Sequence, residues 1–206
     1  RNLAVELART HPQAVIAGTG SSVAMAVLVP RNLMIAVISL LTTRVSAGIF
    51  TRGAEEAVVV CHPTASGPEK RWPAEAFAQV ADRLISEAHV RIVLVAGAKG
   101  RTDCEAVARA MRAAPLRADG VLNLQELAAL LRRARLLISN DSGPVHVAVS
   151  QGTPVIALFG RTQPGVNPER WKPLGPRDVV LCREPLSALS PDEVFRSAAP
   201  FLHSPV

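Results

Sequence analysis

The sequence is poor in aromatic residues and in cysteine. Among 206 residues there are five phenylalanines, two tryptophans and no tyrosine. Because base stacking needs aromatic side chains, this composition argues against a nucleic-acid partner. The three cysteines, Cys61, Cys104 and Cys182, are far apart and odd in number. They predict neither a disulfide framework nor a zinc site, and they fit a reducing, cytoplasmic location.

Long apolar runs are also missing. The most apolar region, residues 23–41, is interrupted at residues 30–32 by Pro-Arg-Asn, so neither run reaches the roughly 20 residues that span a bilayer. No signal-peptide pattern opens the chain, and it begins at Arg1 rather than at Met, so we expect a fragment of a longer protein. The net charge of +6 predicts an anionic ligand or peripheral contact with a membrane surface. We expect no protein partner.

Several chemical motifs are absent as well. The sequence has no G-x-x-x-x-G-K-[ST] loop, which argues against an ATPase, and no G-x-G-x-x-G, which argues against a nicotinamide or flavin enzyme. No pair of Asp, Glu or His residues stands at metal-ligand spacing. We therefore expect neither a cofactor nor a metal.

What is present is a regular alternation of strands and helices from residue 57 onward. Apolar, β-branched runs predict strands at 57–61, 91–97, 135–139, 154–160 and 178–182. Helical spacing of apolar residues follows four of these runs, whereas a loop rich in Pro and Gly follows 154–160. Capping boxes are predicted at Thr102, Asn123 and Ser190. This order predicts an α/β fold with a Rossmann-like, doubly wound parallel sheet over residues 55–206. Residues 1–54 are interpreted as a partial N-terminal domain.

Polar and glycine residues collect where these strands end. In an open parallel sheet the ligand lies beyond the carboxyl ends of the strands, so loops that follow different strands meet at one rim. We expect a ligand site there. The candidate binding residues are Thr64, Ser66 and Lys70 after the first strand, Gly97 after the second, and Asp141, Ser142, Gly143 and His146 after the third.

The residues after the third predicted strand, 141–146, predict the start of a helix. Ser142 suits the cap, Gly143 lets a ligand approach the backbone or adopts a positive φ, and Pro144 suits the first helical position. A helix N-terminus binds phosphate through free amides, whereas the Asp141 carboxylate repels phosphate and suits capping or a sugar hydroxyl. For Lys70 and His146, an ordinary surface position remains the alternative to a role at the anion.

Two stretches together resemble a known family. "HPTASGPEKRWPAEAFAQVADRL" (62–84) and "SNDSGPVHVAVSQGTPVIALFG" (139–160) are similar to the nucleotide-binding half of the bacterial heptosyltransferases, glycosyltransferase family 9. The resemblance covers about residues 57–182 and implies two Rossmann-like domains facing a cleft. The second domain would hold an ADP-heptose donor, and the first a lipid-linked saccharide acceptor of the lipopolysaccharide core and a catalytic aspartate. Such an enzyme would work at the inner face of the cytoplasmic membrane.

The resemblance also implies roles for individual residues. Lys70 would contact the donor phosphates and act as the catalytic group, Ser142 and Gly143 would donate to the diphosphate, and Asp141 and His146 would line the donor pocket. Thr64 and Ser66 would flank it.

Two departures from the family pattern leave other functions open. No glycine-aspartate motif for the general base occurs in residues 1–56, and the acidic residue that the family often has after the second strand is not evident in "VAGAKGRTD". The chain alone is therefore expected to be inactive as a transferase. A non-catalytic nucleotide or nucleotide-sugar binding module is the alternative, and a nucleotide-sugar epimerase or hydrolase is a third reading.

Overall fold

The computed structural model describes residues 57–164 and 168–202, so the predicted N-terminal domain and its boundary lie outside the described residues. The described part contains one six-stranded sheet in which all strands are parallel, in the order β3-β2-β1-β4-β5-β6. The predicted Rossmann-like sheet is confirmed. The strands are β1 (Val58–His62), β2 (Arg91–Leu94), β3 (Leu116–Arg117), β4 (Leu136–Asn140), β5 (Val155–Phe159) and β6 (Val179–Cys182).

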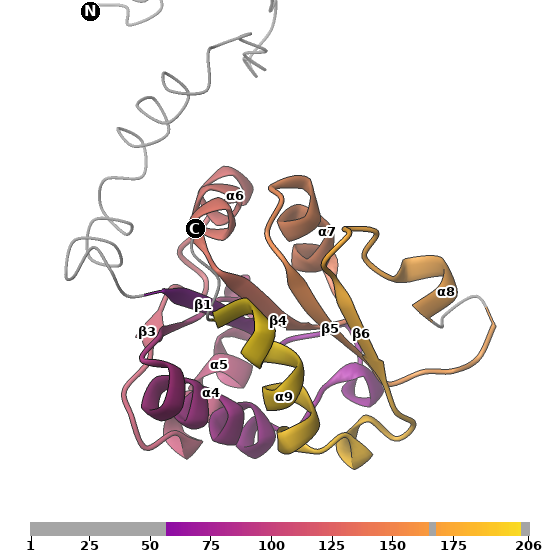
Figure 1. The fold of residues 1–206 in the computed structure, drawn as a ribbon, viewed down its shortest axis with the longest axis horizontal. Helices are drawn as coiled ribbons and strands as arrows, with labels where there is room; N and C mark the ends of the chain where they lie inside the picture. The colour runs from indigo at the N-terminus through magenta and orange to yellow at the C-terminus, as the bar shows by residue number, and fades with distance from the viewer. Residues whose placement is uncertain (1–56, 165–167, 203–206) are drawn as a thin grey trace, which may run out of the picture. The chain divides into compact units, whose positions relative to one another are not determined.

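Helices cover both faces of the sheet (Figure 1). One face carries α4 (Ala74–Ala88), α5 (Arg101–Ala110) and α9 (Pro191–Leu202), and the other carries α6 (Leu124–Arg133) and α7 (Gly143–Ser150). The loops contain a short helix α8 (Pro168–Trp171) and the 3₁₀ turns η1 (Pro68–Lys70), η2 (Ala98–Gly100) and η3 (Leu186–Ala188). The sequence patterns had not indicated α8 or the two-residue strand β3, because both are too short to show a period.

Burial on both faces explains the continuous apolar runs of the strands. All five residues of β1, β4 and β5 are buried. Val59 and Cys61 of β1 pack toward the α4 side, whereas Val58 and Val60 pack toward α6 and α7. Since successive strand residues point to opposite faces, a strand covered on both faces has no polar alternation.

The predicted helix caps meet three different outcomes. Asn123 forms the full capping box with Glu126, as predicted. At Ser190 the hydroxyl oxygen accepts from the Glu193 amide at 3.2 Å, while the Glu193 carboxylate pairs with an arginine instead. The box at Thr102 is wrong: η2 runs directly into α5, so Thr102 already lies inside the helix, which is preceded by Gly100.

The chain order creates one special position at the sheet edge. From β1 the chain moves outward through β2 and β3, then returns to form β4 on the other side of β1. The loops after β1 and β4 therefore leave the sheet next to each other and turn toward opposite faces, which makes this the topological switch point of the sheet.

Within the described residues, no helix combines the length and apolar character needed to cross a membrane.

Candidate functional site

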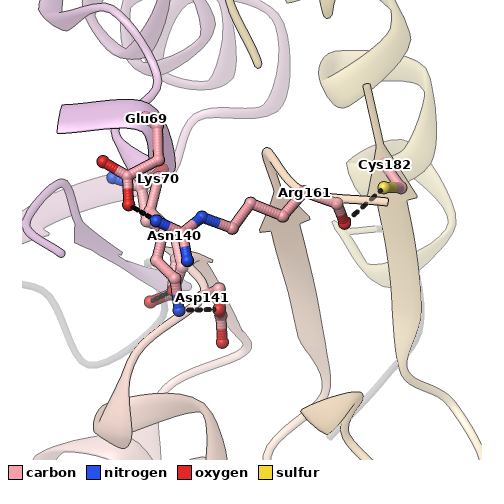
Figure 2. A network of polar contacts seen from close by, with 7 residues as sticks. Glu69, Lys70, Asn140, Asp141, Arg161 and Cys182 are labelled. Carbon is pink, nitrogen blue, oxygen red and sulfur yellow. Dashed lines mark hydrogen bonds and ion pairs between the residues drawn. The ribbon is translucent and has the colours of Figure 1, made fainter. Parts of the chain in front are cut away.

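The switch point joins two of the predicted residues in an ion pair. Lys70, at the end of η1, lies in the loop after β1, and Asp141 directly follows β4. The Lys70 ammonium is 2.5 Å from Oδ2 of Asp141, and the two side chains are only 19% and 12% exposed (Figure 2). The sequence predicted both residues at the ligand but not their contact. An ammonium has three donors, so this pair leaves Lys70 able to donate to a further anion.

Helix α7 begins beside this pair with fewer free donors than the sequence predicted. Ser142 is the extended cap residue, and its side chain makes no capping bond. Pro144 has no amide hydrogen, and the Val145 amide donates to the Ser142 carbonyl oxygen at 3.1 Å. Among the described residues, the Gly143 amide has no acceptor. The Gly143 amide and the Ser142 hydroxyl are therefore two donors that this helix end offers to an anion.

Gly143 does not need a positive φ, so the expectation of a left-handed turn there is wrong. A Cβ placed on Gly143 would meet nothing within 4 Å. The protein itself therefore leaves room for a side chain at this position. Open space above an exposed helix start is what a bound anion requires.

The loop after β1, which contains η1, is also held against the end of β5 by a second ion pair and by close packing. Glu69 pairs with Arg161, which follows β5 (Figure 2). A Cβ on Gly160 would lie 2.2 Å from the Glu69 carbonyl oxygen, so only glycine lets η1 cross the end of β5. A cavity of about 690 Å³ opens beside this contact, and it is lined by Pro68, Glu69, Arg71, Gly160, Arg161, Gln163, Glu184, Pro185, Leu186 and Ser187.

Other predicted residues lie at the rim without joining the pair. Ser66, Gly97 and His146 are exposed, and the His146 side chain makes no hydrogen bond to another described residue. Thr64 packs against η2, where its Cγ2 lies 2.6 Å from a Cβ placed on Gly100. Thr64 thus shapes the packing between two rim loops. The structure brings together Lys70, Asp141, Ser142 and Gly143, and leaves the rest around them.

A buried polar group lies directly beneath the site. Nδ1 of His62 is 3.2 Å from the Ser139 hydroxyl, which donates to the Asn140 carbonyl oxygen at 2.7 Å. The Ser139 proton is thereby used, so the His62 ring donates through Nδ1. Burial lowers the pKa of His62 from 6.5 to about 4, because the charged ring would lose its hydration. His62 is therefore a neutral part of the framework at pH 7.

Sequence reasoning missed Asn140 as a residue of the site. The predicted strand ended at residue 139, whereas β4 ends at Asn140, whose side chain is fully buried. The only available signal was an amide side chain next to Asp141 at the end of an apolar strand. No group of three or more His, Cys, Asp or Glu side chains in the described ranges is arranged to hold a metal ion.

Fold and site together define the class: a Rossmann-like α/β domain with a candidate phosphate site at its switch point. The model of glycosyltransferase family 9 (heptosyltransferase) matches residues 30–193. The chain therefore belongs to glycosyltransferase family 9.

Individual relatives agree with this assignment. The lipopolysaccharide core heptosyltransferase OpsX of Haemophilus influenzae is 35% identical over 122 residues, which cover 58% of this chain and 33% of that protein. A crystal structure of a family 9 glycosyl transferase from Veillonella parvula matches with a TM-score of 0.71 at 27% identity, covering 89% of this chain and 55% of that one. ADP-heptose lps heptosyltransferase II of Escherichia coli shares the fold, with a TM-score of 0.69 at 23% identity and the same coverage. The chain spans about a third of the length of the curated relatives it matches.

Proposed function

We propose that the chain is the donor-binding part of a heptosyltransferase that transfers heptose from ADP-heptose to a lipopolysaccharide core acceptor. The observation that carries this proposal is the meeting of Lys70 with the start of α7 at the switch point of the sheet. The family match supports glycosyl transfer and heptose as the sugar. The resemblance noted in the sequence suggests ADP-heptose as the donor. The candidate site supplies groups that suit a diphosphate.

In this proposal the site stabilises the leaving group. Displacement at the anomeric carbon transfers negative charge to the departing diphosphate, and cationic or amide donors placed at that charge lower the barrier. Lys70 would donate to one phosphate while Asp141 holds its ammonium in place, and the Gly143 amide and Ser142 hydroxyl would donate to the same diphosphate. His146, in the first turn of α7, would meet the outer phosphate or the sugar.

The general base and the acceptor surface are proposed to lie outside the described residues. We propose a cytoplasmic enzyme that meets its lipid-linked acceptor at the inner face of the membrane, without a protein partner. The net charge of +6 favours contact with an anionic membrane surface.

Calorimetric titration of the 206-residue chain with ADP, UDP and GDP tests the donor assignment. We expect ADP to bind, and to bind more tightly than the other two. A chain that binds none of them, or that prefers UDP, contradicts the proposal. Binding of ADP-heptose without transfer by a longer protein that includes the acceptor side would favour the non-catalytic module.

A further inference from the structure

The buried side chain of Asn140 holds both ends of the loop that carries Lys70. Its Nδ2 donates to the Pro63 carbonyl oxygen at 2.7 Å, where the loop leaves β1. Its Oδ1 accepts from the Trp72 amide at 3.1 Å, where the loop enters α4. Asn140 is fully buried, and both contacts join it to residues at least 68 positions away.

The two bonds to Asn140 satisfy the Pro63 carbonyl and the Trp72 amide. A buried amide or carbonyl without a partner is strongly unfavourable, so the loop gains a fixed position from these bonds. Trp72 is anchored as well, because its indole donates to the Leu189 carbonyl oxygen at 2.9 Å and packs edge-on against Phe77. Among the described residues, Asn140 is the one whose side chain bonds both Pro63 and Trp72, at the two ends of the loop.

That point is directly adjacent to the residue that pairs with Lys70. Asn140 and Asp141 are consecutive, so the end of β4 holds the loop backbone with one side chain and the Lys70 ammonium with the next. Asn140 points into the protein beneath the loop and makes no contact with the open space at Gly143. Its influence on a ligand at that space is therefore indirect.

We propose that Asn140 is a positioning residue, which fixes the loop so that Lys70 reaches the diphosphate of the donor. This inference rests on the proposed function for its ligand. Its structural content, that Asn140 holds the loop, is independent of that function. A positioning role requires the effect of Asn140 on ligand binding to depend on the presence of Lys70.

A double-mutant cycle in ADP binding tests that dependence. We expect Asn140→Ala to weaken ADP binding by about the same factor as Lys70→Met, on the order of 10-fold. In the Lys70→Met background, Asn140→Ala should weaken binding by less than about twofold, because the group it positions is gone. Asn140→Ser, whose single hydroxyl reaches at most one loop end, should lie between Asn140→Ala and the wild type.

Thr153→Val is the matched control for a general loss of stability. Thr153 is also buried and also holds a buried carbonyl, that of Leu131, through its hydroxyl at 2.7 Å. We expect it to lower the melting temperature without changing ADP affinity. The proposal is overturned if Asn140→Ala binds ADP like Thr153→Val, or if Asn140→Ala retains its full effect without Lys70.

Limited trypsin digestion gives a readout that needs no ligand. Cleavage after Lys70 or Arg71 should be faster in Asn140→Ala and in Asn140→Ser than in Thr153→Val, because the released loop can enter the protease. Equal cleavage rates overturn the proposal even where Asn140→Ala is too unstable for titration. If the wild type binds no nucleotide but the loop is released as expected, the proposed function fails and the loop-holding role of Asn140 stands.

Discussion

Replacing Lys70 with methionine tests the two contacts of its ammonium, the ion pair with Asp141 and the proposed contact with the donor phosphates. Lys70→Met keeps most of the apolar stem and removes the charge. In the free protein it leaves Asp141, which is only 12% exposed, without its cation. We expect a loss of about 1 to 3 kcal/mol in the free energy of unfolding, below the roughly 3 to 5 kcal/mol of a fully buried pair, because water still reaches both groups.

The effect on ligand binding has a similar size and a different origin. A charge-assisted hydrogen bond to phosphate contributes about 1 to 3 kcal/mol, so ADP should bind about 5- to 150-fold more weakly to Lys70→Met. Adding Asp141→Asn removes the orphaned carboxylate. The double variant should recover most of the lost stability, but it should still bind ADP more weakly than the wild type because the Lys70 ammonium is absent.

Calorimetric titration with ADP, together with urea unfolding, measures both effects. Lys172→Met is the matched control, because it removes the same charge from an exposed lysine that follows α8. We expect the Lys172 variant to bind ADP like the wild type. Unchanged ADP affinity in folded Lys70→Met refutes the assignment of Lys70 to the phosphates. An equal loss of affinity in Lys172→Met would show that the loss comes from the lower net charge of the protein and not from a contact of Lys70.

Three further predictions test the surroundings of the site. Gly143→Val should abolish ADP binding, because its side chain would fill the open space proposed for the diphosphate. The melting temperature should change little, because nothing in the protein lies within 4 Å of the new Cβ. Gly160→Ala should lower the melting temperature and weaken ADP binding together, because its Cβ would displace the Glu69 carbonyl. The pKa of His62 is lowered to about 4, so the unfolded chain is protonated first as the pH falls. The contribution of neutral His62 to the free energy of unfolding should be fully present above pH 6.5 and should fall by at most about 3 kcal/mol toward pH 4. Urea unfolding at several pH values measures this loss. We expect the loss in the control variant His146→Gln and not in His62→Gln.

The sequence by itself determined the fold class and the rim at which the candidate site lies. Strands such as Val58–His62 read as strands because a sheet covered on both faces needs uninterrupted apolar runs. Their alternation with amphipathic helices left the parallel doubly wound sheet as the consistent solution, and that sheet places polar loops such as the one around Ser142 at its carboxyl edge. These features depend on local period and order, which a sequence carries directly.

The tertiary structure decided which of the rim residues act together. Lys70 and Asp141 pair across 71 positions, and Asn140 reaches Pro63 across 77. No local pattern encodes such partners, because they arise only when β1 and β4 become neighbours at the switch point. The same holds for Gly143 and Gly160, which look alike in sequence: open space surrounds the first, and the backbone of η1 crosses the second. Contacts between distant segments depend on how the helices and strands pack. That packing decides which rim residues contact each other and which lie at the same rim without contact.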